Sequence, residues 1–385
     1  MLHLYKLHTG ELPTYLEDEF ADGRQGRFWA GRLCSEVELP EVPDIESVQM
    51  LLDARHMGRR HPGGGPSKLA AIQLSFSAPK GVSVAALVYR DERILTAHHI
   101  AVAHAMQYVE DAMVCRVTHQ NKTIAVPTMG LMMAIFHRYQ SRSGDPHLHT
   151  NALLFNCGKI DGGKWRAIDS RTLWEEQHLI GAVYRSSLMG SLEGMGYQTI
   201  FRDDGLFEVG DVDGAVCDLF SGRRDEIAAK VHQVTKNPIG DLRGPSTVPF
   251  AVSTASRLEC VRYPARLAQW VARASGVPAT FSPPEGPGKS AAPTECHAVE
   301  AALATGYESL RSRLGGVKLG SLLMHCYVES KGSLSVRSLL ESLQDDVIAG
   351  IYTVEGTPRT VFNHEDHIQY LERKGFFEDS AAETV

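Results

Sequence analysis

Apolar residues alternate with polar ones in some segments of this chain and recur at helical spacing in others. Both β-strands and α-helices are therefore predicted. Short apolar or alternating runs predict strands over residues 2–7, 69–77, 117–126 and 130–136, and a hairpin over 197–209. Apolar residues at helical spacing predict helices over 37–51, 95–110, 180–194, 299–314 and 336–347. Strands and helices are mixed through the first two thirds of the chain, whereas the last part is mostly helical.

One more strand, over residues 147–155, is predicted to have two chemically different faces. Its polar face carries His147, His149 and Asn151, and its other face carries Leu148, Thr150 and Ala152. Side chains on one face of a strand lie roughly 6.5 to 7 Å apart, so two of them can converge on one metal ion. His137 is a candidate third ligand from a neighbouring element. The alternative is chance, because the chain contains 17 histidines.

The length and the turn-forming residues suggest a large domain followed by a smaller one. Residues 281–298 are rich in Pro, Gly and Ser and are predicted to be a linker. Residues 299–385 are predicted to form a small, mostly helical α/β domain of unknown role, with a hairpin over 351–362. The Gly288-Lys289-Ser290 triplet is no phosphate-binding loop, because Pro283 stands where that loop requires its leading glycine.

The composition indicates a soluble cytoplasmic protein, with 43% hydrophobic and 22% charged residues. No apolar run approaches the ~18 residues that span a bilayer, so no membrane insertion is expected. The seven cysteines form no CxxC pair and are expected to be reduced thiols.

The net charge of −7 argues against a nucleic-acid partner, but positive charge is locally dense. Residues 55–68 contain three arginines, two histidines and one lysine around a run of three glycines. A solvated loop and a DNA-contacting loop are equally compatible with this segment.

Two motifs resemble those of one known family. The stretch 136–150 contains F-H-x-x-x-S-R-x-x-D-P-x-L-H-T, and residues 76–84 read FSAPKGVSV. Both are similar to motifs of the MobF, or TrwC/TraI-type, conjugative relaxases, which are HUH endonucleases. The resemblance covers roughly residues 1–280. It implies an α+β fold, with a central antiparallel sheet of about five strands, helices packed on it, and a helical flap over about 212–276.

The resemblance also implies roles for individual residues. Tyr15 matches the nucleophile position, although Leu16 replaces the adjacent tyrosine found in relatives. Lys80 and Arg142, from the two motifs, are expected to bind DNA. Gln73 matches an Asp that in relatives assists the histidines and the nucleophile, and glutamine can orient a histidine but cannot act as a base.

The metal site implied by the resemblance departs from the family pattern. Asn151 stands where relatives have a histidine, and the gap from His137 to His149 is one residue longer. We predict His137, His149 and Asn151 as ligands with His147 close by, or alternatively His147 and His149 as the pair. An amide oxygen favours Mg²⁺ or Mn²⁺.

The predicted function is therefore site- and strand-specific nicking of single-stranded or hairpin plasmid origin DNA. In this reaction Tyr15 attacks a phosphate and forms a 5′-phosphotyrosyl intermediate with help from a divalent metal. Conjugation accessory proteins are further candidate partners, and no helicase domain is present in the sequence. Two alternatives stay open, namely a degenerate relaxase that binds origin or hairpin DNA without cutting it, and a rolling-circle replication initiator.

Overall fold

The computed structural model of the chain describes most of its first 222 residues and several later segments. The described residues are 2–8, 26–53, 69–119, 122–141, 143–222, 226, 229, 263–278, 281–284, 296–314 and 319–348. Several features discussed above lie outside them. They are Tyr15, Leu16, Arg142, the basic segment 55–68, most of residues 223–262 of the predicted flap, residues 285–295 of the linker and the hairpin predicted over 351–362.

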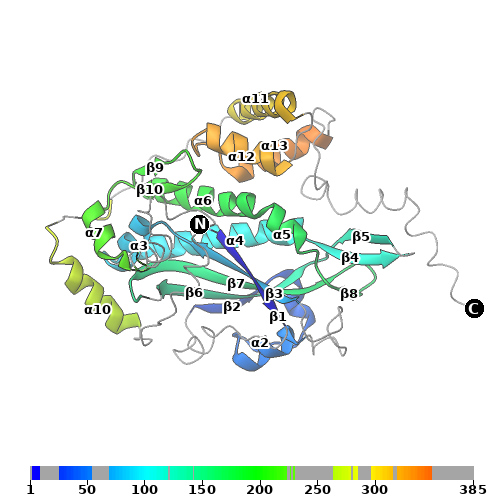
Figure 1. Cartoon of the computed structure of the whole chain (residues 1–385), viewed down its shortest axis with the longest axis horizontal. Helices are drawn as coiled ribbons and strands as arrows, with labels where there is room; N and C mark the ends of the chain where they lie inside the picture. Colours follow the sequence, from blue (N-terminus) through cyan, green and yellow to red (C-terminus); the bar gives the residue numbers. More distant parts are fainter. Residues whose placement is uncertain are drawn as a thin grey trace, which may run out of the picture.

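A central antiparallel sheet runs in the order β1-β3-β7-β6-β2, with β8 paired to β7 (Figure 1). Its strands are β1 (Leu2–His8), β2 (Arg27–Ala30), β3 (Leu69–Ser77), β6 (Leu131–Gln140), β7 (Pro146–Lys159) and β8 (Trp165–Arg166). Two separate hairpins are formed by β4 (Val114–His119) with β5 (Lys122–Pro127), and by β9 (Thr199–Phe201) with β10 (Phe207–Val209). The predicted α+β class and antiparallel sheet are confirmed.

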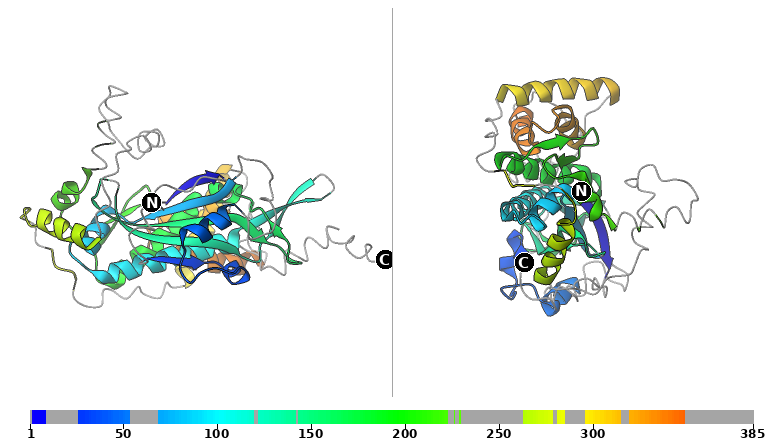
Figure 2. Two further views of the ribbon diagram at one scale, coloured as in Figure 1. Left: turned by 90° about the horizontal axis from the view of Figure 1, so that it is seen from below. Right: turned by 90° about the vertical axis from the view of Figure 1, so that its left-hand side faces the viewer.

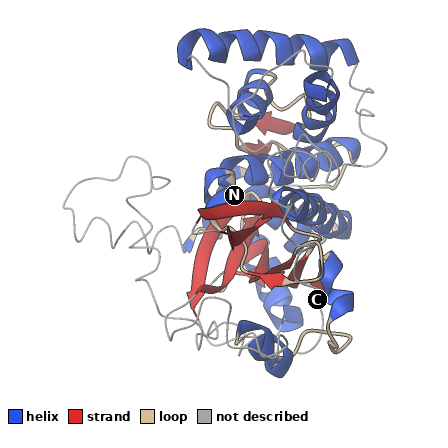
Figure 3. Ribbon diagram, turned by 90° about the vertical axis from the view of Figure 1, so that its right-hand side faces the viewer, coloured by secondary structure: helices blue, strands red, loops and turns tan. Residues whose placement is uncertain are grey.

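Helices cover both faces of this sheet. They are η1 (Arg32–Glu36), α2 (Ile45–Leu52), α3 (Lys80–Leu87), α4 (Glu92–Ala112), α5 (Arg171–Glu175), α6 (Gln177–Gly194), α7 (Gly214–Leu219), α10 (Tyr263–Ala274), α11 (Cys296–Leu314), α12 (Leu319–Glu329) and α13 (Val336–Ile348). The long helices α4 and α6 lie on one face, and α2 lies on the opposite face (Figures 1 and 3). No described helix combines the length and apolar character needed to cross a membrane.

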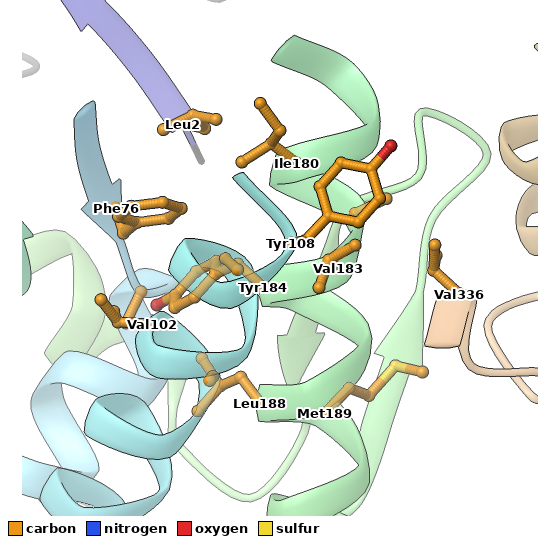
Figure 4. Close-up of a cluster of buried hydrophobic side chains, with 14 of the residues drawn as sticks. Leu2, Phe76, Val102, Tyr108, Ile180, Val183, Tyr184, Leu188, Met189 and Val336 are labelled. Carbon is orange, nitrogen blue, oxygen red and sulfur yellow. The ribbon is translucent and has the colours of Figure 1, made fainter. Parts of the chain in front are cut away.

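The main core lies between the sheet and the layer formed by α4 and α6. It includes Leu2 of β1, Phe76 of β3 and Tyr184 of α6, all of which are buried (Figure 4). The alternation of β1 and β3 directs these side chains to one face, because successive strand residues point to opposite sides. A second, smaller cluster joins α2 to the other face through Val48 and Leu51. Asp44 begins α2 with a capping box that involves Ser47.

The C-terminal helices α11, α12 and α13 pack outside α6, so the molecule has stacked layers (Figure 2). Leu303, Leu322 and Val336 belong to the same buried cluster as the main core. Helices α11 and α13 were predicted, whereas α12 was not.

Candidate functional site

The face of the sheet opposite α4 and α6 carries a group of polar side chains from β3, β6 and β7. Asn151 pairs with Ser75 on one side, and His149 pairs with Ser77 on one side and Arg138 on the other. Residues that pair directly across strands share a face. Gln73, two positions before Ser75, is on the same face. The alternation of β7 therefore brings His147, His149 and Asn151 together as predicted.

The Asn151 amide is held by hydrogen bonds within the sheet. Its Oδ1 atom accepts hydrogen bonds from Ser75 Oγ at 2.6 Å and from Gln73 Nε2 at 3.2 Å. Gln73 Nε2 also donates to Ser75 Oγ at 2.9 Å. All three residues are buried. Gln73 thus orients Asn151 rather than a histidine, and both lone-pair directions of the amide oxygen are used.

His147 and His149 form a stacked pair of imidazoles, with ring centroids 4.4 Å apart. The Nδ1 of His149 lies 2.9 Å from the carbonyl oxygen of His147. A carbonyl only accepts, so Nδ1 carries the proton and Nε2 of neutral His149 keeps its lone pair. Burial, and next the charge of Arg138, lower the pKa of His149 to about 4. His149 is therefore neutral at pH 7.

His137 lies on the opposite face of the sheet, which corrects the predicted ligand set. It pairs with Thr150, not with His149 or Asn151. Its Nδ1 atom is 2.7 Å from Thr150 Oγ1, and its ring stacks on His99 at 3.6 Å. Side chains alternate between faces with a period of two, so one extra residue before His149 turns His137 away.

Thr150 also contacts a histidine of α4, and this network was missed from the sequence. The Nε2 atom of His98 is 2.8 Å from Thr150 Oγ1, and its Nδ1 atom is 2.8 Å from Tyr184 Oη. His98 is fully buried within this network. The sequence feature that could have indicated this network is the polar Thr150 on an otherwise apolar face of the strand.

Arg138 takes the place on the site face that was predicted for His137. It is half-buried and pairs with His149 across β6 and β7. The extra residue in the gap between His137 and His149 was the signal that could have identified it. A guanidinium is a permanent cation with no acceptor, so Arg138 cannot ligate a metal.

Lys80, predicted to bind DNA, has its ammonium group turned toward the protein. Its Nζ donates to the carbonyl oxygens of Pro146 and Phe220, each at 3.0 Å. Burial is the main cause of its lowered pKa. These bonds tie the start of β7 to α3 and to the end of α7. DNA binding by Lys80 stays a prediction.

An antiparallel sheet whose central strand carries histidines on one face is the arrangement expected from the resemblance to the HUH endonucleases. Within that class the chain belongs to the TrwC relaxase family, whose model matches residues 5–254.

Among similar proteins are two "Multifunctional conjugation protein TraI" sequences of Escherichia coli, one of them from strain K12. Each is 29% identical over 238 residues, which are 58% of this chain and 13% of TraI. The chain thus spans about an eighth of the length of these relatives.

Solved structures of the conjugative relaxase TrwC in complex with oriT DNA are also similar. A metal-bound form of TrwC has a TM-score of 0.65 and is 30% identical to this chain. The matched region covers 73% of this chain and 100% of the TrwC chain. A copper-bound form has a TM-score of 0.63 and a metal-free form 0.64, both at 28% identity with the same coverage. TrwC has therefore been solved both with a bound metal and without one.

The described residues of this chain do not fit such a metal. His149 and His147 offer imidazoles, but the Asn151 oxygen already accepts two hydrogen bonds. Arg138 places positive charge beside His149. Within the described ranges, no group of three or more His, Cys, Asp or Glu side chains is placed to hold a metal ion.

The segment that carries Tyr15 re-enters the described structure beside this part of the sheet. Gly26 accepts a hydrogen bond from the backbone of His137 at 2.8 Å. It has a φ of +79°, and an added Cβ would lie 3.2 Å from His137 Cβ, which requires glycine here. Ten residues separate Tyr15 from Gly26, and the eleven Cα-to-Cα steps between them can span at most about 36 Å. The tether length is compatible with Tyr15 reaching the site face.

Proposed function

We propose that this chain is the relaxase domain of a conjugation protein and that it nicks one strand of plasmid origin DNA in single-stranded or hairpin form. The observation that carries the proposal is the gathering of His147, His149 and Asn151 on one sheet face, in a chain of the TrwC relaxase family. TrwC has been solved in complex with oriT DNA, and in one complex the DNA comprises the recognition hairpin and the cleavage site. Conjugation accessory proteins and a cytoplasmic location are part of this proposal.

In the proposed reaction, Tyr15 Oη forms a bond to phosphorus and the bond from phosphorus to the 3′ oxygen breaks. The phenol gives up its proton as the new bond forms, and the leaving 3′ oxygen takes up a proton, so the products are a 5′-phosphotyrosyl enzyme and a free 3′-hydroxyl. One phosphate ester replaces another, so the strand can be resealed. Neutral His149, with its Nε2 lone pair available, would accept a hydrogen bond from the attacking phenol or from water.

A second candidate function is binding of origin DNA without cleavage. The specific observation in its favour is the Gln73–Ser75–Asn151 cluster, in which amides and a hydroxyl satisfy one another. None of these three groups can take up a proton as a base at neutral pH. Such a site would bind a DNA strand and leave it uncut.

The two candidates are distinguished by incubating the full chain with labelled single-stranded origin DNA. The assay is run with Mg²⁺, with Mn²⁺ (the metals predicted from the sequence) and with EDTA. Wild type is expected to form a covalent adduct, resolved on a denaturing gel, that Tyr15→Phe loses completely. His149→Ala should reduce the adduct at least about tenfold, since one catalytic hydrogen-bonding group is typically worth 10²–10⁴ in rate.

His137→Ala is the matched control, because His137 lies behind the sheet. It should keep the adduct as long as circular dichroism shows that it folds. A shifted DNA complex without any adduct would reject the nuclease and select the binder. Unchanged nicking by His149→Ala would remove β7 from the mechanism.

A further inference from the structure

The site face of the sheet holds a permanent cation where the predicted metal set required a neutral ligand. Arg138 lies directly across from His149, and directly paired side chains on antiparallel strands have Cβ atoms about 5 Å apart. Positive charge is therefore built into the protein at this point. It is independent of any ion taken up from solution.

We propose that the Arg138 guanidinium is the phosphate-binding cation of this site and that it holds single-stranded DNA without a divalent metal. This inference rests on the proposed function, because it concerns the same site and the same substrate. Guanidinium matches phosphate well, since its planar fork donates two parallel hydrogen bonds to two oxygens. Its single charge does part of what a metal ion would do for the scissile phosphate.

The neighbours of Arg138 suit a phosphate better than a metal. Asn151 Oδ1 already accepts hydrogen bonds from Ser75 and Gln73, so both of its lone-pair directions are used. A divalent ion beside His149 would be repelled by the guanidinium at a distance of a few Å. Tetrahedral phosphate would instead be attracted by the same charge.

Metal exclusion is tested by titrating the full chain with Mn²⁺ alone in an isothermal calorimeter. Wild type should show no saturable binding. The double variant Arg138→His, Asn151→His removes the charge and adds two imidazoles beside those of His147 and His149 on one face, so it should gain a stoichiometric Mn²⁺ site that wild type lacks. Adding His137→Asn to the double variant should not change this gain.

Phosphate binding is tested by fluorescence anisotropy with labelled oligo(dT) in excess EDTA. Arg138→Gln should weaken binding about tenfold and reduce the slope of log K against log salt by about 0.7, the value for one phosphate contact on a single strand. Arg138→Lys should retain part of the affinity. Arg116→Gln is the matched control, because Arg116 is exposed on the separate β4–β5 hairpin.

Three results would overturn the inference. They are stoichiometric Mn²⁺ binding by wild type that His149→Ala abolishes, a folded double variant that binds no Mn²⁺, and equal DNA binding by the Arg138→Gln and Arg116→Gln variants. An adduct that requires metal would overturn the inference while the proposed nicking stands. DNA binding that resists EDTA and depends on Arg138, but gives no adduct, would support the inference and reject the proposed nicking.

Discussion

Thr150 links two histidines across the interface between the sheet and helix α4. Its hydroxyl has one proton, so it donates to one imidazole and accepts from the other, and His98 continues the chain to Tyr184. Every link is buried, where an unpaired polar atom is costly. The network thereby fixes the orientation of β7, whose other face carries the candidate site.

Thr150→Val is expected to destabilise the protein by about 2–4 kcal/mol. Valine has nearly the shape of threonine, but it leaves one nitrogen each of His98 and His137 unsatisfied, at about 1–3 kcal/mol per buried group. Urea unfolding followed by circular dichroism measures the change. Thr118→Val on the exposed hairpin is the control and should stay within about 0.5 kcal/mol. Equal stability of the two variants would contradict the role given to Thr150.

At the scale of elements, helix α10 anchors the turn that introduces β7. The buried Trp270 donates from Nε1 to the carbonyl oxygen of Gly144 at 2.8 Å. Arg273 forms an ion pair with Asp145 at 3.3 Å and donates to the carbonyl oxygen of Leu219 at 2.9 Å. The helix thus joins the β6–β7 turn to the end of α7.

Trp270→Ala should release α10 from this turn. Removing a fully buried tryptophan costs about 3–5 kcal/mol, and the loss should fall mainly on the local docking of the helix. Limited proteolysis is expected to cut near α10 at least several-fold faster than in wild type. Val271→Ala changes the exposed neighbour on the same helix and should leave the cleavage rate unchanged. Equal rates in the two variants would show that α10 does not depend on Trp270.

Sequence patterns predicted the elements better than they predicted the site. Residues 147–152 alternate between a face with His147, His149 and Asn151 and a face with Leu148, Thr150 and Ala152, so the two faces of β7 were predicted correctly. His137 was assigned to the wrong face because its position depends on the length of the β6–β7 turn, where one residue reverses every side chain. Helix α12 was missed because the apolar residues Met324 and Val328 lie on the side opposite its buried stripe of Leu322, Leu323, Cys326 and Tyr327, so no polar face marks the helix.

In the whole molecule, buried imidazoles are concentrated around one sheet. Burial, and next the neighbouring His99, lower the pKa of His137 to about 3. Burial, and next His137 and His99, put the pKa of His98 well below its usual value. Both rings are neutral in the folded state at pH 7, and both are close enough to oppose each other's protonation. The folded protein therefore resists taking up protons that the unfolded chain accepts readily.

Mild acid should destabilise the protein before its carboxylates titrate. The unfolded chain binds protons on His98 and His137 below about pH 6.5, whereas the folded protein does not bind them until the pH nears the much lower folded pKa values. The free energy of unfolding is therefore highest above pH 6.5. It falls as the pH decreases, by roughly 2 kcal/mol per such histidine at pH 5. Urea midpoints measured between about pH 7.5 and pH 5 test this. The His137→Gln variant removes one titrating group, so its midpoint should fall less steeply. A wild-type midpoint that is constant or rises over this range would show that these imidazoles are not held neutral by the fold.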